Sequence, residues 1–281
     1  AEKLKDMGIA GVPNQVPLGT SNLITAISAP GLFAMMATSY FHRYGLSPQE
    51  GKRMLSHIPV KSHHNGAMNP KAHFRREVTL EQVLNSPIIA WPLGIFDCCG
   101  TSDGAAAAIL VPASEARKYR RDPIYIKALQ ICANPADGAR RSDFDFTHIE
   151  AGYRAGLAAY REAGVKNPRQ EISMAEVHDC FSINEAIIME DLQFSPRGKV
   201  KDDLESGFFN LDGKLPVQPS GGLKCFGHPV AATGLRMLYE MCKQLQGKAG
   251  PRQVKNPKLG LTHNMGGHPA DNVVSCVIVG L

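Results

Sequence analysis

Residues 221–229 read Gly-Gly-Leu-Lys-Cys-Phe-Gly-His-Pro, so one histidine stands between a glycine and a proline. The pair Gly221-Gly222 allows a sharp turn or a close approach of the backbone to another group. Apolar residues then recur at helical spacing as far as Leu245, which predicts a helix with one buried face. Pro229 suits the first turn of that helix and places His228 at its N-terminus. The helix dipole disfavours imidazolium there, so His228 is predicted to be a neutral base near pH 7; the alternative is a capped helix with an incidental histidine.

Strand patterns and helix patterns alternate on both sides of this motif. Such alternation is typical of strands covered by helices and predicts an α/β fold. A run of small and then branched apolar residues at 105–111 predicts a buried strand. The other predicted strands span 124–131, 171–177, 258–262 and 273–279, and helices are predicted at 149–163 and 182–192.

The composition is that of a globular protein. A chain of 281 residues, 43% hydrophobic and 20% charged, suits one large domain or two smaller ones. The net charge of +5 fits an anionic small-molecule ligand, and because no dense Lys/Arg block occurs we set nucleic acid aside as a partner. No apolar run reaches the roughly 18 residues of a membrane span, and no signal peptide is found. Seven irregularly spaced cysteines indicate a reducing compartment, so a cytoplasmic location is expected.

A second motif, Val-His-Asp-Cys-Phe at residues 177–181, lies where a predicted strand meets a predicted helix. Ligands of α/β sheets usually bind at strand ends. His178 and Cys180 in one turn could supply acid–base chemistry or a nucleophile, and a helix N-terminus would lower the pKa of the thiol. The structural alternative is a turn that contains a buried cysteine.

A third motif, His-Asn-Met-Gly-Gly-His-Pro at residues 263–269, is predicted as the turn between the last two strands. Backbone N–H groups at Gly266 and Gly267 could form an oxyanion hole, although an ordinary hairpin turn fits as well. Together the three motifs favour acyl transfer or enolate chemistry, which both need a base, an acid and oxyanion stabilisation. A metal site made by His178, Cys180 and His228 is disfavoured, because no carboxylate or second cysteine pair supports it.

Upstream, Ser47-Pro48 followed by Glu50 predicts the start of a helix. Residues 61–70 read Lys-Ser-His-His-Asn-Gly-Ala-Met-Asn-Pro and are predicted as a polar loop with turn-forming pairs. His63, His64 and the lysine could line the path of an anionic ligand, but a solvated surface loop is the favoured interpretation. These two histidines and His73 do not form a convincing metal set.

The sequence that contains these motifs resembles the thiolase family along essentially its whole length. The resemblance is strongest to the subgroup that is similar to the thiolase domain of sterol carrier protein X. Residues 61–70 resemble that subgroup's loop-domain signature, and residues 101–107 resemble the end of the family's first half. His-Asp-Cys-Phe at 178–181 stands where other thiolases carry Asn-Glu-Ala-Phe, and residues 227–229 match the family's Gly-His-Pro.

The resemblance implies a five-layered αβαβα thiolase fold with two similar halves, here without the first part of the N-terminal half. The implied divisions are 1–85 (loop domain), 86–120 (end of the N-terminal half) and 121–281 (C-terminal half). By match, His228 activates the nucleophile and helps to bind the thioester oxygen, Cys180 is the second acid/base, and His178 helps to build an oxyanion hole. Gly266 or Gly267 is expected in the second oxyanion hole. The residues expected to contact acyl-CoA are His63, Ser220, Gly221 and Gly222.

The nucleophilic cysteine of thiolases is expected on a segment that would precede Ala1, so this chain alone is expected not to cleave acetoacetyl-CoA. The final turn also departs from the subgroup's Gly-x-Gly-Gly pattern. The resemblance implies an acyltransferase acting on acyl-CoA or 3-ketoacyl-CoA, with coenzyme A as substrate, no cofactor or metal, and a dimeric or tetrameric assembly. The alternatives are a thiolase-like retro-aldolase subunit with a DUF35/OB-fold partner, and a non-catalytic subunit that binds acyl-CoA.

Overall fold

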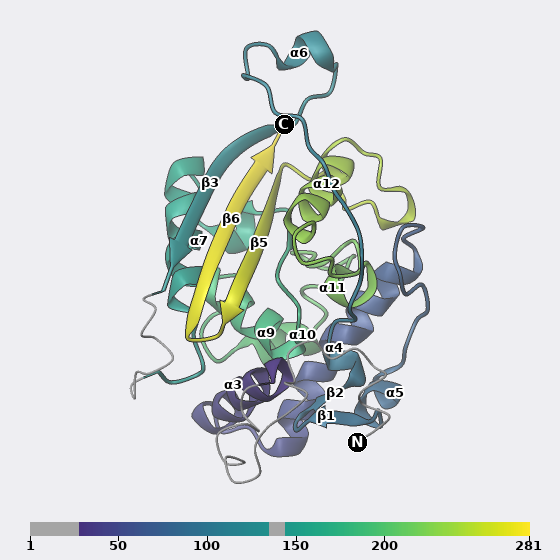
Figure 1. Cartoon of the computed structure of the whole chain (residues 1–281), viewed down its shortest axis with the longest axis vertical. Helices are drawn as coiled ribbons and strands as arrows, with labels where there is room; N and C mark the ends of the chain where they lie inside the picture. The colour runs from purple at the N-terminus through teal and green to yellow at the C-terminus, as the bar shows by residue number, and fades with distance from the viewer. Residues whose placement is uncertain (1–27, 135–143) are drawn as a thin grey trace, which may run out of the picture.

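A four-stranded mixed sheet, in the order β3-β6-β5-β4, forms the centre of the molecule (Figure 1). The computed structural model describes residues 28–134 and 144–281, so residues 1–27 of the expected loop domain lie outside the described part. β4 runs parallel to β5, whereas β5–β6 and β6–β3 are antiparallel. The strands are β3 (Tyr125–Ala133), β4 (Met174–Glu176), β5 (Leu259–His268) and β6 (Asp271–Gly280). The predicted α/β class is confirmed.

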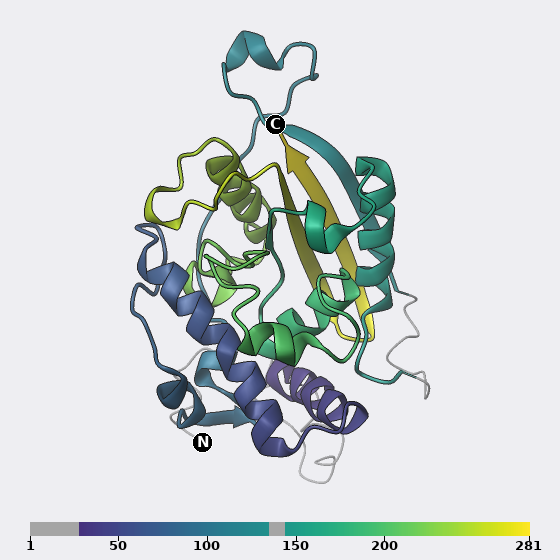
Figure 2. The same cartoon turned by 180° about the vertical axis from the view of Figure 1, so that it is seen from behind.

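Helices cover both faces of this sheet (Figures 1 and 2). α7 (Glu150–Ala163) packs on β3 and β6, and α12 (Thr233–Leu245) packs mainly on β5. Successive side chains of a strand point to opposite faces. In β6, Cys276 and Ile278 accordingly share a core with the small residues of α7, whereas Val279 joins Met241 of α12.

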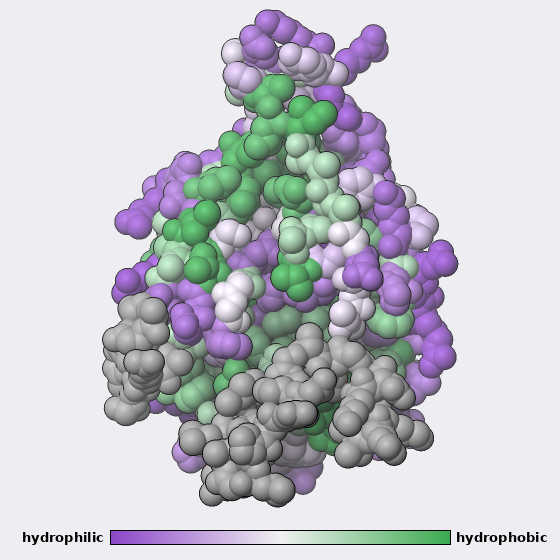
Figure 3. Space-filling model, in the orientation of Figure 1, coloured by the Kyte–Doolittle hydropathy of each residue, from purple (hydrophilic) through white to green (hydrophobic). Residues whose placement is uncertain are grey.

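Part of the sheet has no helical cover. Leu129 and Ile131 of β3 lie opposite Val277 and Ser275 of β6, and this face holds exposed Leu129, Ile131 and Val273. Figure 3 shows the resulting apolar area over β3 and β6. In β5, Asn264 is in register with Ser275, so its side chain lies on the same face. The uncovered face of the sheet therefore runs from apolar residues on β3 and β6 to the polar side chain of Asn264 on β5.

The lower region in Figure 1 is mainly helical. α4 (Pro48–Ala67) packs against α9 (Ser182–Asp191), α10 (Val200–Glu205) and α11 (Gly222–Cys225), and α3 (Ala29–Arg43) packs on α9. All ten residues of α9 are buried, which makes it the central helix of this region. The shorter elements are α5 (Leu80–Leu84), β1 (Ile88–Ala90), β2 (Leu93–Gly94), the 3-10 helix η1 (Ile95–Asp97), α6 (Ala116–Tyr119), α8 (Pro168–Glu171) and the 3-10 helix η3 (Gly250–Arg252).

The predicted start of α4 is confirmed, because Ser47 and Glu50 form a reciprocal capping box. The predicted polar loop at 61–70 is wrong, since α4 continues to Ala67. Lys61, Asn65 and Asn69, spaced four residues apart, lie on one side of the helix end and are buried. They donate to the backbone oxygens of Val217 (2.8 Å), Gln218 (2.9 Å) and Ser220 (2.9 Å), respectively. The polar pattern thus marks a buried contact with another segment.

The strand predicted at 105–111 is also wrong. These residues have no strand partner within the described part of the chain, and Ile109 and Leu110 are 94% and 74% exposed. An apolar run becomes a strand only where a neighbouring strand completes its hydrogen-bond ladder.

The turn predicted at 263–269 is mostly strand, because β5 extends to His268. Among the described helices, none is long and apolar enough to cross a membrane. The three divisions of the chain stay predictions.

Candidate active site

The two histidine motifs meet on a third stretch of chain, residues 98–101. Cys98 forms an antiparallel bridge with Phe181, and Thr101 forms a parallel bridge with His228. The backbone N–H of Cys99 donates to the carbonyl oxygen of Cys180 at 2.9 Å. One short segment therefore holds the His-Asp-Cys turn and the Gly-His-Pro turn side by side.

The rings of His178 and His228 come together edge to face, with centroids 5.0 Å apart and planes at 84°. Asn264, on β5, lies beside the His178 ring, and its side chain acts to raise the pKa of that ring. Sequence reasoning singled out the glycines that follow Asn264 and missed the asparagine itself. The available signal was its place in a polar motif, on a strand whose alternate residues share a face.

His228 does not lie in the first turn of a helix, as the sequence predicted, because α12 begins only at Thr233. Gly227 has φ +117°, a glycine conformation that turns the chain, and His228 follows in extended backbone. The Thr233 hydroxyl donates to the carbonyl oxygen of Pro229 at 3.0 Å and lies 2.8 Å from Nδ1 of His228. Since its proton is committed, it accepts from Nδ1–H, which leaves Nε2 of His228 as the basic nitrogen.

Burial lowers the pKa of His228 to about 4, with a further contribution from the positive charge of Arg236. The ring is therefore neutral at pH 7, as expected, but burial rather than a helix dipole is the cause. Burial also holds the pKa of His178 well below its usual range, and the neighbouring rings of His228 and His263 act in the same direction. Nδ1 of His178 has no hydrogen-bond partner in the part of the chain that the structure describes.

Cys180 is buried just before α9, and its Sγ lies 3.7 Å from the amide nitrogen of Asn184. Burial raises the pKa of the Cys180 thiol well above its usual range, and the neighbouring Cys99 adds to the effect. The expectation that a helix N-terminus would lower this pKa is wrong, because burial outweighs the dipole. Cys180 keeps its proton at neutral pH and can serve as an acid.

The glycine pair is a site of very close packing. Gly221 has φ +97°, and a Cβ on it would lie 2.7 Å from Cα of Gly66 in α4. Gly222 has φ +66°, and a Cβ on it would lie 2.4 Å from Oδ2 of Asp179. The same carboxylate accepts from the N–H of Leu223 through Oδ1 at 2.7 Å. The glycines thus bring α4 and the His-Asp-Cys turn against α11.

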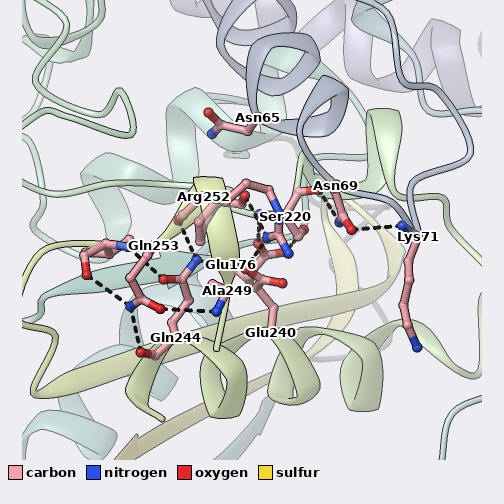
Figure 4. A network of polar contacts seen from close by, with 12 residues as sticks. Asn65, Asn69, Lys71, Glu176, Ser220, Glu240, Gln244, Ala249, Arg252 and Gln253 are labelled. Carbon is pink, nitrogen blue, oxygen red and sulfur yellow. Dashed lines mark hydrogen bonds and ion pairs between the residues drawn. The ribbon is translucent and has the colours of Figure 1, made fainter. Parts of the chain in front are cut away.

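Ser220, which precedes the pair, is fully buried in a polar network (Figure 4). Its N–H and hydroxyl donate to the two carboxylate oxygens of Glu176 at 2.9 and 2.8 Å, and Arg236 donates to Glu176 at 2.6 Å. Figure 4 also shows Arg252 beside Glu240, and Arg252 donates to the carbonyl oxygen of Pro219 at 3.2 Å. Residues 217–220 are therefore held rigidly, and contact of Ser220, Gly221 and Gly222 with acyl-CoA stays a prediction.

The remaining predicted residues lie in less central positions. His63 is buried, its Nδ1 lies 2.8 Å from the carbonyl oxygen of Arg76, and burial lowers its pKa. Gly266 and Gly267 belong to β5, two and three positions beyond Asn264. Gly267 has φ +99° and a Cβ there would lie 2.4 Å from the carbonyl oxygen of Asp271, so the hairpin itself requires this glycine. Oxyanion binding by either glycine stays a prediction.

Residues 28–134 and 144–281 contain no group of three His, Cys, Asp or Glu side chains arranged to hold a metal ion. A cavity of about 860 Å³ lies elsewhere, between α3, α7 and the loop after α9, and contains none of the candidate residues. Two of the cations that line it already have carboxylate partners: Arg169 pairs with Asp203, and Arg197 pairs with Asp191. We therefore assign the candidate site to the paired histidines and Cys180.

Asp179 gives this site a pH dependence that can be measured in the folding equilibrium. Burial raises its pKa to about 7, opposed by the charge of Lys224 and supported by that of Glu185. Because the folded state binds this proton more tightly than the unfolded state, the free energy of unfolding should fall as the pH rises from about 4 to about 7. Asp179→Asn is expected to flatten this slope, measured as thermal midpoints across that range. Equal slopes in wild type and variant would show that Asp179 does not titrate there.

An opposite control is available at Asp122, whose pKa Lys248 and Arg120 lower to about 2. Its stabilising effect is present above the ordinary aspartate pKa and is lost only as the pH falls toward about 2. Asp122→Asn should therefore leave the slope between pH 4 and 7 as it is in the wild type.

Comparison with known proteins agrees with the resemblance of the motifs. Residues 137–278 match the family model described as "Thiolase C-terminal domain-like". The chain is 43% identical over 242 residues to the acetyl-CoA acetyltransferase of Methanothermobacter thermautotrophicus, covering 86% of this chain and 61% of that protein. It is 33% identical over 255 residues to sterol carrier protein 2 of Gallus gallus, covering 90% of this chain and 46% of that protein.

Among solved structures, the one described as "Ltp2-ChsH2(DUF35) aldolase" superimposes with a TM-score of 0.77 at 25% identity, over 95% of this chain and 69% of that chain. The chain spans about three fifths of the length of the acetyl-CoA acetyltransferase relative, 61%, and less than half of sterol carrier protein 2, 46%.

Proposed function

The chain belongs to the thiolase family and has its fold, and from that premise we propose that it carries the acid–base groups of an acyltransferase acting on acyl-CoA or 3-ketoacyl-CoA. One observation carries the proposal. The rings of His178 and His228, both neutral at pH 7, lie with their centroids 5.0 Å apart, and the thiol of Cys180 nearby keeps its proton. Similarity to an acetyl-CoA acetyltransferase at 43% identity supports it.

In the proposed reaction, His228 removes a proton through Nε2, because its Nδ1–H is bound to Thr233. Cys180 returns a proton to the enolate that forms when a carbon–carbon bond of a 3-ketoacyl-CoA breaks, or when an α-proton leaves acetyl-CoA. The neutral ring of His178 donates a hydrogen bond to the thioester oxygen, where negative charge develops. Gly266 or Gly267 is proposed to supply a second oxyanion contact.

The proposal places the acyl-accepting cysteine outside this cluster. In six of the seven cysteines the thiol pKa is raised, chiefly by burial: Cys98, Cys99, Cys180, Cys225, Cys242 and Cys276. A catalytic nucleophile needs the opposite shift. We therefore propose that none of these six cysteines is the group that is acylated.

Coenzyme A takes part as a substrate, and we propose no metal or organic cofactor. A homo-oligomer is proposed by analogy with the family, and a location in the cytoplasm is supported by seven cysteines that are all free. His63, Ser220, Gly221 and Gly222 remain proposed contacts of acyl-CoA, although their burial means that any such contact has to be indirect or follow a rearrangement.

A second candidate is a retro-aldolase that works with a DUF35/OB-fold partner. It is favoured by the likeness, at TM-score 0.77, to the structure described as "Ltp2-ChsH2(DUF35) aldolase". A retro-aldol cleavage of a 3-hydroxyacyl-CoA needs a base and enolate stabilisation but no acyl acceptor. The same histidines could therefore support it. A non-catalytic subunit that binds acyl-CoA is the third candidate.

The proposal is tested by following the exchange of the α-hydrogens of acetyl-CoA in D2O by mass spectrometry. This exchange needs a base, an acid and an oxyanion hole but no acyl acceptor, so the chain is expected to catalyse it. Acetoacetyl-CoA with free coenzyme A is expected to stay uncleaved. Binding of acetyl-CoA without exchange would support the non-catalytic subunit, and cleavage of a 3-hydroxyacyl-CoA without free coenzyme A would support the retro-aldolase.

A further inference from the structure

Lys224 lies inside the glycine–histidine motif, yet neither the proposed reaction nor the motif resemblance uses it. It is on α11, and only 3% of its surface is exposed. Nζ donates to the carbonyl oxygen of Asp97 at 2.8 Å and to that of Asp179 at 3.1 Å. One carbonyl immediately precedes Cys98, and the other immediately precedes Cys180. A single ammonium thus joins the two segments on which the site is built.

This placement determines how Cys180 sits relative to His228. The segment fixed at Asp97 continues to Cys99, whose N–H bonds to the carbonyl oxygen of Cys180, and to Thr101, which bridges to His228. The turn fixed at Asp179 carries Cys180 directly. Because both segments depend on the same ammonium, removing it would free both carbonyls and loosen both contacts of the site.

The charge of Lys224 also acts on the thiol. The titratable and charged groups that act on Cys180 are Cys99 from the 98–101 segment, Asp179 from its own turn and Lys224 from α11, and the neutral donors beside it are the N–H of Phe181 and the amide of Asn184. Burial, Cys99 and Asp179 favour the protonated thiol, whereas the charge of Lys224 and, more weakly, the backbone N–H of Phe181 favour the thiolate. Lys61, which is also buried, donates to the carbonyl oxygen of Val217 and pairs with Glu185, and it is not among the largest influences on the Cys180 thiol.

We infer that Lys224 is a positioning residue, which clamps the 97–101 segment to the His-Asp-Cys turn and biases the proton equilibrium of the Cys180 thiol. The inference rests on the proposed function only in naming Cys180 as the acid. The clamp itself rests on the two hydrogen bonds of the ammonium.

The test uses Lys224→Gln, which loses the charge and whose side chain is one bond too short to hold both carbonyls, and Lys224→Arg, which keeps the charge and the reach. Lys61→Gln is the matched control, because it also neutralises a buried lysine that caps a backbone carbonyl. The rate of Cys180 alkylation by iodoacetamide is measured by peptide mass mapping from pH 7 to 9, with no substrate present. Hydrogen–deuterium exchange of the peptides around Cys99 and Cys180 is measured in parallel.

Lys224→Gln is expected to slow Cys180 alkylation on the order of tenfold at fixed pH, the effect of a one-unit rise in its pKa. It should also speed amide exchange at both peptides. Lys224→Arg should restore most of the alkylation rate, and Lys61→Gln should leave Cys180 at the wild-type rate. Equal alkylation in Lys224→Gln and Lys61→Gln, or wild-type amide exchange in Lys224→Gln, would overturn the inference. Neither readout needs turnover, so a failure of the proposed function would appear separately, as absent α-hydrogen exchange in the wild type.

Discussion

Replacement of His228 by alanine is expected to slow the exchange of the α-hydrogens of acetyl-CoA on the order of 10²–10⁴-fold, the usual contribution of a positioned proton transfer. His228 is the group in the cluster that combines a low pKa with a fixed tautomer, since Thr233 occupies its Nδ1. Alanine removes the base and leaves the fold in place, because the ring is only partly buried. The measurement is the exchange rate at saturating acetyl-CoA.

The control for this loss is His57→Ala. His57 is a partly buried histidine on α4 whose pKa is also lowered by burial and whose Nε2 has no partner in the described chain. Its replacement should leave exchange at the wild-type rate. The exchange rate of Thr233→Val is expected to lie between those of His228→Ala and His57→Ala, because the His228 ring stays but its tautomer is no longer fixed. Full activity of His228→Ala would remove His228 from the proposed role and favour a base elsewhere.

Much of the sheet could be predicted from hydrophobic patterns. The strands ending at Ala133 and Gly280 and the helices α7 and α9 lie within a few residues of their predicted ranges. These elements bury their apolar residues in the arrangement that their own period dictates. The resemblance of the histidine motifs added the family, which patterns of this kind cannot supply.

The errors share a physical cause, which is that the deciding partner lies far away in the sequence. Residues 61–70 look like a surface loop because Lys61, Asn65 and Asn69 are polar, but their partners are carbonyl groups more than 150 residues later. The run at 105–111 looks like a buried strand, but the described chain offers it no neighbouring strand. A local pattern reports what a segment can do, whereas distant partners determine what it does.

The candidate site, like the fold, could be predicted only in part from local sequence patterns. The sequence placed His178, Cys180 and His228 in polar turns, and the structure brings these turns together through residues 98–101. The roles of that segment and of Asn264 could not be predicted, because they depend on tertiary contacts with residues far away in the sequence. The pKa shifts of the cluster depend on burial, which only the assembled structure defines.

Gly222→Ala is expected to destabilise the protein by about 2–5 kcal/mol. The left-handed backbone at φ +66° costs a non-glycine residue about 1–2 kcal/mol, and overpacking a buried position adds about 1–3 kcal/mol. The overpacking arises because the new Cβ would lie 2.4 Å from Oδ2 of Asp179. The measurement is the free energy of unfolding from denaturant titration at constant pH.

Gly247 provides the matched control, since its φ of +67° is nearly the same but no atom lies within 4 Å of its added Cβ. Gly247→Ala should therefore show the backbone cost alone, about 1–2 kcal/mol. The excess at Gly222 should shrink when Asp179→Ala is combined with Gly222→Ala, because the smaller side chain removes the collision. Two outcomes would contradict this explanation: Gly222→Ala lowers the free energy of unfolding no more than Gly247→Ala, or the double variant shows no coupling. In either case the contact with the Asp179 carboxylate is not the reason that position 222 is glycine. If the coupling appears, the motif at residues 221–229 and the His-Asp-Cys turn are linked through this contact. A substitution in one of them then changes the packing of the other.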